Sequence, residues 1–198
     1  MISDRHLDTL QEMVNIGFGR AARSLSELTG QRVTLEVPAI ELVPTSNLAV
    51  FFVDLIPGKI AAVHQNLQGG FEGDCMLVLS HSSAEALANL LTEERSRPFG
   101  LDDSDQEILS ELGNILLNAF VGSFGNLLKA RLVLSVPALF VDRIEALFDG
   151  ILKQEADAQA LVVTTTFHLA SKAVSGYVVM VFSFASTEAL VSSLEELG

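Results

Sequence analysis

Apolar residues recur at helical spacing in two long segments, one in each half of the chain. In the segment from about 3 to 28 they are Leu7, Leu10, Val14, Leu25 and Leu28, and in the segment from about 102 to 128 they are Leu109, Leu112, Leu116, Phe120 and Leu127. Steps of three and four residues place these side chains on one face of a helix. The pattern therefore predicts that a long amphipathic helix opens each half.

Shorter apolar runs follow each predicted helix and have the length of β-strands. RVTLEVP (32–38) and RLVLSVP (131–137) alternate apolar and polar residues, and we expect the proline to end each strand. Further strands are predicted from LAVFFVDLI (48–56), KIAAVHQNL (59–67), DCMLVLS (74–80), ALVVTTTFHLA (160–170) and YVVMVFSF (177–184). RIEALFDGILKQ (143–154) predicts a short inserted helix, and another helix closes each half.

The two halves resemble each other in sequence. An offset of 99 residues aligns 4–39 with 103–138, and twelve of these 36 positions are identical without a gap. A second offset, of 103 residues, aligns 73–91 with 176–194, which share Ser-x-x-Ser-x-Glu-Ala-Leu. Such self-similarity indicates a duplicated unit. We expect two halves, residues 1–95 and 101–198, joined near 95–101 and packed as one compact domain.

These elements predict an α+β fold. Two duplicated α-β-β-β-α units with short connections favour a joined antiparallel sheet with helices packed on it, arranged about a pseudo-twofold axis. Hydrophobic residues make up 49% of the chain, which is enough to form a substantial core.

Charge and composition exclude several classes of function. A net charge of −13 and a pI of about 4.5 disfavour binding to nucleic acid or to anionic membranes. The start MISDRHLDTL has no basic n-region and no apolar h-region, so we expect no signal peptide. No run approaches the roughly 18 apolar residues that a membrane span requires, so no span is expected. A single cysteine allows no internal disulfide, which fits a cytoplasmic location. Cys75 is the single cysteine, and we interpret it as a buried strand residue. The four histidines lack ligand spacing, so no metal site is expected.

A polar stripe occurs at equivalent positions of both predicted helices. Asp8, Glu12 and Asn15 stand at i, i+4 and i+7 of the first helix, and Glu107, Glu111 and Asn114 repeat the stripe in the second. On a single helix such a stripe is an ordinary solvated face. Like charges at i and i+4 weaken a helix slightly, however, and their recurrence with asparagine in both halves favours a function.

The stripe and its spacing resemble a family signature. Asp8-x-x-x-Glu12-x-x-Asn15, then 22 residues, then Pro38 is similar to the motif of the CheC/CheX/FliY phosphatases. Glu111-x-x-Asn114, then 22 residues, then Pro137 is a second copy, and NIGFGRAARSLSELTGQRVTLEVPAIELVP resembles the opening of CheC. Glu107 departs from the family pattern, which has Asp or Ser at that position.

The resemblance implies a phosphatase that hydrolyses the aspartyl phosphate of a CheY-type chemotaxis response regulator. Asn15 and Asn114 would position the attacking water, and Glu12 and Glu111 would pair with a lysine of the regulator. Asp8 and Glu107 would support docking, with Pro38 and Pro137 as supporting positions. The regulator itself would carry Mg²⁺, so no cofactor is expected on this chain.

Two questions stay open at the level of sequence. Gly17 lies inside a helical pattern, where glycine is unfavourable, which indicates a close approach either of a partner or of the protein's own sheet. The alternative function is a non-catalytic adaptor on the same fold, binding a response regulator, the deamidase CheD or a flagellar switch component. CheD is also a possible partner of the phosphatase. Two motifs in one chain favour a monomer, and because the sequence shows no motor domain after Gly198, a motor role of the FliY kind is not the expected function.

Overall fold

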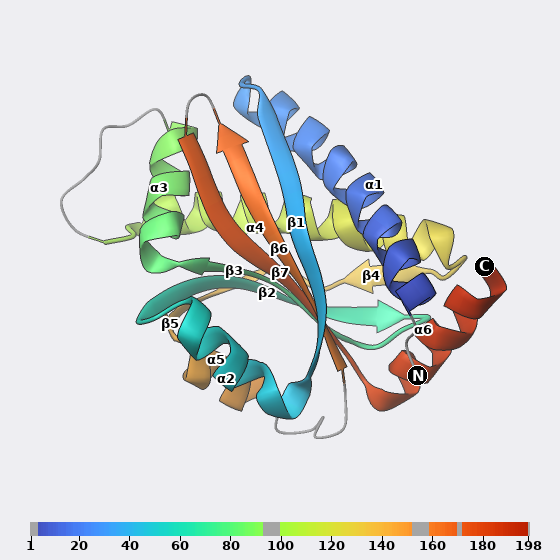
Figure 1. Cartoon of the computed structure of the whole chain (residues 1–198). Helices are drawn as coiled ribbons and strands as arrows, with labels where there is room; N and C mark the ends of the chain where they lie inside the picture. Colours follow the sequence, from blue (N-terminus) through green and yellow to red (C-terminus); the bar gives the residue numbers. More distant parts are fainter. Residues whose placement is uncertain (1–3, 93–99, 152–158, 170–171, 198) are drawn as a thin grey trace.

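The computed structural model describes residues 4–92, 100–151, 159–169 and 172–197 as one seven-stranded sheet with helices on both faces (Figure 1). The helices are α1 (Asp4–Thr29), α2 (Thr45–Leu55), α3 (His81–Thr92), α4 (Asp103–Leu127), α5 (Ile144–Ile151) and α6 (Phe184–Leu197). The strands are β1 (Val33–Pro44), β2 (Lys59–Gly69), β3 (Gly73–Ser80), β4 (Leu132–Leu134), β5 (Ala138–Arg143), β6 (Gln159–Leu169) and β7 (Lys172–Phe182). The predicted α+β class is confirmed.

The order of the strands is symmetric under exchange of the two halves. Every pairing is antiparallel, and the order is β1-β6-β7-β3-β2-β4, with β5 also paired to β2. Exchanging β2 with β6, β3 with β7, and β1 with the β4–β5 pair returns the same order. The central β3–β7 pair therefore joins the halves into one sheet about the expected pseudo-twofold axis. The proposed junction at 95–101 falls mainly on residues outside the described part.

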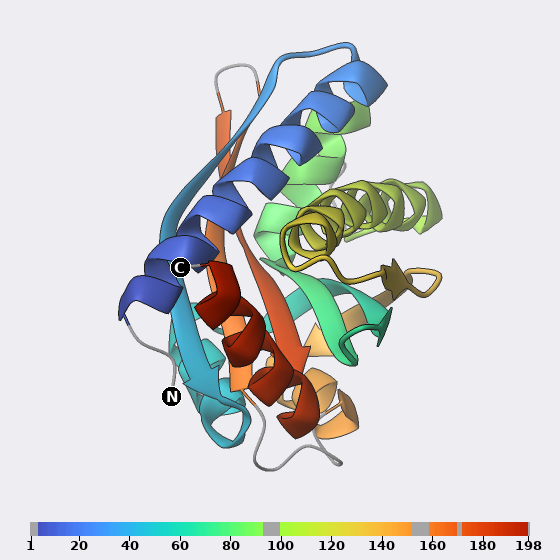
Figure 2. The same cartoon turned by 90° about the vertical axis from the view of Figure 1, so that its right-hand side faces the viewer.

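Two apolar layers hold the sheet between the helices. Alternate residues of the inner strands point to opposite faces, so Ala61 and Val63 belong to one core and Ile60 and Ala62 to the other. The larger core lies under α1, α3, α4 and α6, and the smaller one lies under α2 and α5 (Figure 2). Because both faces are covered, the inner strands contain continuous apolar runs, such as 75–79 of β3 and 178–182 of β7.

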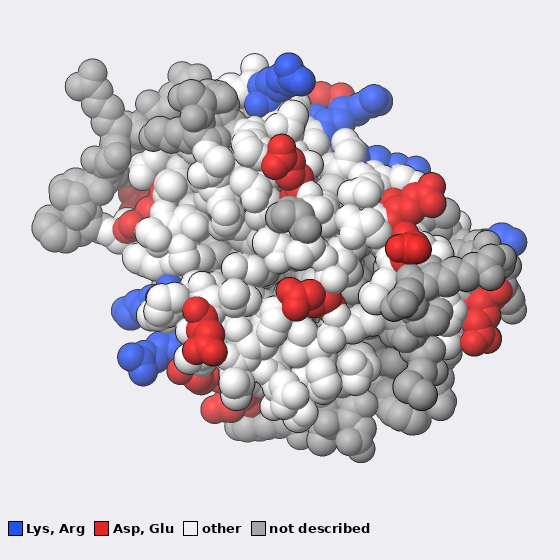
Figure 3. Space-filling view, viewed as in Figure 1, with Lys and Arg blue, Asp and Glu red and all other residues white. Residues whose placement is uncertain are grey.

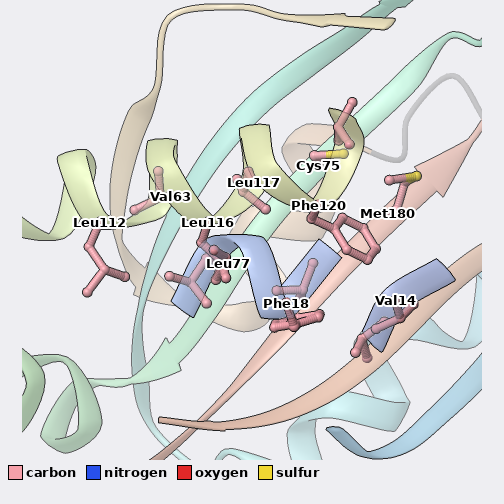
Figure 4. Packing of buried hydrophobic residues seen from close by; sticks show 14 of the residues in the cluster. Val14, Phe18, Val63, Cys75, Leu77, Leu112, Leu116, Leu117, Phe120 and Met180 are labelled. Atoms are coloured by element: carbon pink, nitrogen blue, oxygen red, sulfur yellow. The ribbon is translucent and has the colours of Figure 1, made fainter. Parts of the chain in front are cut away.

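The helices α1 and α4, which carry the polar stripes, pack against each other through their apolar sides. The rings of Phe18 and Phe120 lie 5.7 Å apart between centroids, within a cluster that also includes Val14 and Leu116 (Figure 4). Gly17 is buried at this crossing, where a Cβ atom would lie 3.1 Å from the Cα of Phe120. The close approach predicted at Gly17 is therefore to α4. It is neither to the sheet nor to a partner.

Two sequence-based element predictions are wrong. The segment 48–56 is not a strand, because Thr45–Leu55 forms α2, which is anchored by buried Leu48 and Phe52. Phe52 packs its ring 5.6 Å from Phe148 of α5 and 5.2 Å from Tyr177 of β7. The short helix within 143–154 is confirmed as α5. It occupies the place in the second half that α2 occupies in the first, so α5 is not an insert. The predicted α-β-β-β-α unit is in fact α-β-α-β-β-α in the first half, and the second half has the same order with the pair β4 and β5 in place of β1.

Proline does not end the first strand. β1 continues through Pro38 to Pro44, and its pairing with β6 shifts register between Glu36 and Ala39. An irregularity tolerates a residue that lacks an N–H group, because a ladder bond is already missing there. In the second half the corresponding stretch is interrupted, and Pro137 lies between β4 and β5.

The helix starts account for part of the repeated sequence. In the shared Ser-x-x-Ser motif, Ser80 Oγ accepts a hydrogen bond from the N–H of Ser83 at 3.0 Å, and Ser183 Oγ accepts one from Ser186 at 3.2 Å. A capping box in which Asp102 and Asp105 bond each other's backbone N–H groups starts α4.

α4 also contains a stretch, Asp103–Asn126, that is long and apolar enough to cross a membrane by length and composition alone. Half of the most apolar window is buried inside the protein. A core helix of a globular domain gives the same signal, and the packing of α4 on α1 and β2 accounts for its apolar composition.

Candidate active site

The structure exposes the carboxylates of both stripes. Asp8 and Glu12 on α1, and Glu107 and Glu111 on α4, are all exposed to solvent. The stripes therefore point away from the apolar contact that joins α1 to α4. On the face shown in Figure 3, acidic side chains are spread over the middle and the basic ones stand near the edges. This distribution agrees with the strong negative net charge.

The two asparagines differ in their surroundings. Asn15 is exposed, and no hydrogen bond joins its side chain to any residue that the structure describes. Asn114 is half-buried, and its Oδ1 accepts hydrogen bonds from Gln65 Nε2 at 3.2 Å and from Asn118 Nδ2 at 2.8 Å. The sequence pattern treats the two positions as equivalents, but only the second amide is fixed by its neighbours.

An open cavity of about 790 Å³ lies beside Asn114. Its lining comes from three segments: Ser24 of α1; Asn114, Ile115, Asn118 and Ala119 of α4; and residues 134–137 of the β4–β5 connection. The two ends of the second signature, Asn114 and Pro137, thus meet at one cavity although 22 residues separate them in sequence. For the first signature, β1 contains Pro38, but its side chain lies outside the described part.

Hydrogen bonds to β2 hold the β4–β5 connection in place. The N–H of Ser135 donates to the carbonyl of Asn66 at 2.9 Å, and Ser135 Oγ accepts from the N–H of Asn66 at 2.9 Å. Gln65 Nε2 donates to the carbonyl of Ser135 at 2.6 Å. These bonds leave Val136, which follows Ser135 on the cavity wall, 85% exposed. An exposed apolar side chain beside the polar stripe is suited to contact a partner protein.

Other candidate groups do not join this site. Within the described residues, no three His, Cys, Asp or Glu side chains are grouped so that they could hold a metal ion. Cys75 is buried in β3, and its burial, aided by the charge of Asp74, raises the pKa of the thiol far above the ordinary range. A thiol of this kind is a core residue and not a nucleophile.

Sequence reasoning missed Gln65 and Asn118. A signal was available for Gln65, because it follows Ala61 and Val63 at every second residue and is therefore a polar side chain on the inward face of β2. Asn118 lies one helical turn beyond Asn114, where residues i and i+4 meet.

Comparison with known proteins agrees with this geometry. The model of the CheC-like family matches residues 6–42, which include the whole of the first stripe and Pro38. The CheY-P phosphatase CheC of Bacillus subtilis is 27% identical over 171 residues, covering 83% of this chain and 81% of that protein. Residues 6–42 thus match the CheC-like family, and most of the chain is similar to a protein named CheC.

A second relative and two solved structures extend this result. The flagellar motor switch phosphatase FliY of Bacillus subtilis is 30% identical over 122 residues, which is 62% of this chain but only 31% of that longer protein. FliY of Thermotoga maritima has the same fold, with a TM-score of 0.82 at 19% identity and full coverage of both chains. CheX of Borrelia burgdorferi, solved as a CheX–CheY–BeF3–Mg²⁺ complex, aligns with a TM-score of 0.50 at 19% identity, covering 85% of this chain and 97% of that chain.

Proposed function

We propose that this CheC-like protein is a phosphatase that hydrolyses the aspartyl phosphate of a CheY-type response regulator. The observation that carries the proposal is the pair of Glu-x-x-Asn stripes with exposed glutamates, one on α1 and one on α4, with half-buried Asn114 beside Pro137 at an open cavity. The names of the CheC and FliY relatives, and the CheX–CheY complex of a structural neighbour, support the same substrate class.

The reaction requires this chain to position the attacking water and to supply little else. The oxygen of a water molecule attacks phosphorus in line, and the bond from phosphorus to the aspartyl oxygen breaks with its electron pair going to the carboxylate. One proton of the water passes to a phosphoryl oxygen or to solvent. An amide held beside the phosphoryl group orients this water, as a glutamine does in GTPases. Such positioning lowers the activation free energy by about 3–4 kcal/mol, which accelerates the reaction by a factor of about 10² to 10³.

Each polar residue of the stripe has a part in this proposal. Asn15 and Asn114 position the water, while Glu12 and Glu111 pair with a lysine of the regulator and fix the register of docking. Asp8 and Glu107 add negative charge at the edge of the same face. Mg²⁺ belongs to the regulator, where it neutralises the phosphoryl oxygens. Gly17 has no direct part, because it is buried between α1 and α4.

The decisive experiment follows the decay of a radiolabelled phospho-regulator with and without the protein. The proposal expects decay that accelerates in proportion to protein concentration and that stops when Mg²⁺ is chelated. The Asn15→Ala/Asn114→Ala double variant serves as the control and should give no acceleration. An unchanged decay rate together with measurable binding of the regulator would instead support the adaptor function.

The second candidate is the adaptor function, because the matched FliY relative is named a flagellar motor switch phosphatase, a name that joins a place in the motor switch to the catalytic activity. Binding of CheD, a monomeric state and a cytoplasmic location complete the proposal, and all three rest on the resemblance and on the sequence. Size-exclusion chromatography with light scattering, alone and with CheD, tests the first two.

A further inference from the structure

The amide of Asn114 is held from two sides. Gln65 Nε2 and Asn118 Nδ2 both donate to its Oδ1, at 3.2 and 2.8 Å. Asn118 Nδ2 also donates to the backbone carbonyl of Asn114 at 2.8 Å, which ties its side chain to the helix. A carbonyl oxygen has two lone pairs, so these bonds occupy the acceptor capacity of Oδ1. The NH₂ group of Asn114 is left as the part of the amide that a partner meets.

Gln65 is well placed to impose this orientation. Its side chain is buried, with 1% exposure, and its Nε2 donates to both Asn114 Oδ1 and the carbonyl of Ser135. Turning the amide of Gln65 over would bring its oxygen against two other oxygens, so its donor side must face Asn114. Buried polar groups resist displacement, because a lost hydrogen bond is not replaced by water.

The first site lacks both of these supports. The 99-residue offset puts Gly19 at the position of Asn118, and a glycine has no side chain to donate a hydrogen bond. Gln65 faces Cys75 across β2 and β3, and Val163 faces Val178 across β6 and β7. Because Cys75 and Val178 are aligned by the 103-residue offset, Val163 is the counterpart of Gln65. Valine has no polar side-chain atom.

We propose that Gln65, together with Asn118, is a positioning residue that fixes Asn114 with its NH₂ group outward. Asn114 Nδ2 then donates to one lone pair of the attacking water, leaving the other lone pair free to point at phosphorus. Asn15 must be ordered at each docking event, whereas Asn114 is ordered beforehand. The inference rests on the proposed phosphatase function and makes the two sites unequal in turnover.

Gln65→Met tests the proposal on the Asn15→Ala background, in which only the second site works. The substitution removes both hydrogen bonds of Nε2 and keeps the length of the side chain. We expect kcat to fall about tenfold while KM for the phosphorylated regulator changes less than twofold, because only the geometry of the reacting groups is lost. On the Asn114→Ala background the same substitution should add no further loss.

Gly19→Asn is the complementary change on the Asn114→Ala background. A Cβ atom at position 19 would have no atom of a neighbouring element within 4 Å, so an asparagine side chain can start from this position and reach toward Asn15 one turn away. We expect kcat at the first site to rise about threefold. Nitrogen relaxation of the side-chain NH₂ groups gives a readout apart from activity: Asn114 should be ordered and Asn15 mobile, and Gln65→Met should make Asn114 more mobile than in the unsubstituted protein.

The outcomes separate the two proposals. A folded Gln65→Met variant with unchanged kcat and unchanged NH₂ relaxation of Asn114 would overturn the positioning role. If Gln65→Met does not fold, Asn118→Ala on the exposed surface of α4 takes its place, with an expected threefold loss of kcat; an unchanged kcat there overturns the inference. A fully active Asn15→Ala/Asn114→Ala double variant would instead refute the phosphatase sites themselves.

Discussion

Gly113 of α4 lies directly against Val63 of β2, with no room for a side chain between them. A Cβ atom at position 113 would come within 2.6 Å of the Cβ of Val63, well inside van der Waals contact. The glycine thus lets α4 approach the strand that carries Gln65 two residues beyond Val63. The distance between Gln65 and Asn114, which follows Gly113 on the helix, depends on this approach.

Gly113→Ala should therefore destabilise the protein. The added methyl group overpacks the contact with Val63, which typically costs about 1–3 kcal/mol in the free energy of unfolding. Gly122→Ala is the matched control on the same helix, because nothing lies within 4 Å of its Cβ position. There alanine should stabilise the helix by up to about 1 kcal/mol. Urea unfolding measures both changes, and equal effects would contradict the packing described here.

The asparagine substitutions should separate activity from stability. Asn15→Ala removes an exposed side chain and should change the free energy of unfolding by no more than about 0.5 kcal/mol. Asn114→Ala should cost about 1 kcal/mol, because Gln65 and Asn118 lose an acceptor. Each change should abolish one site, and together they should lower the stimulated dephosphorylation rate by a factor of about 10². Unfolding of the double variant would show that the stripe is structural.

The glutamates should behave differently from the asparagines. Glu12→Ala and Glu111→Ala each remove an exposed carboxylate proposed to pair with a lysine of the regulator. We expect weaker binding of the regulator as well as slower turnover, with the loss in affinity diminishing at high ionic strength. Isothermal titration with the regulator at two salt concentrations checks this. Binding that is unaffected by both substitutions would remove the docking role.

The Cys75 thiol should make stability depend on pH in the alkaline range. Burial and Asp74 raise the pKa of the thiol in the folded protein above the 9.0 of the free side chain. The contribution of the protonated thiol to the free energy of unfolding is complete below pH 9. It is lost as the pH rises further, because the unfolded chain releases the thiol proton while the folded protein keeps it. Between pH 9 and 10.5, wild type should lose more stability than Cys75→Ala, by up to about 1.4 kcal/mol per pH unit. Equal losses in the two proteins would contradict the burial of the thiol.

The repeat was the part of the fold that sequence could predict in most detail. Met76 of β3 lies opposite Val179 of β7, and these two residues are also aligned by the 103-residue offset. In an antiparallel pair, a twofold axis between facing residues exchanges them, so the axis of the protein passes between Met76 and Val179. The sequence offset and the register of β3 with β7 thus place the pseudo-twofold axis at the same point of the chain.

Other features were hidden from sequence for identifiable reasons. In α2 the apolar residues also cover the outer side, where Val50 is 70% exposed and Val53 42% exposed, so no helical period stands out. On the face of β2 that packs toward α4, Gln65 is one polar residue among apolar ones, and the sequence gives no indication of its partner. The contact between Gln65 and Asn114 joins residues 49 apart, and only the packing of α4 on β2 creates it.

The difference between Gln65 and Val163 bears on how the two sites change over generations. In an assembly of two identical chains, a substitution beneath one site necessarily appears beneath the other. Here both halves lie on one polypeptide, and equivalent positions of β2 and β6 hold an amide in one case and an alkyl group in the other. A single substitution can therefore change the turnover of one site and leave the other site unchanged, so selection can act on each site separately.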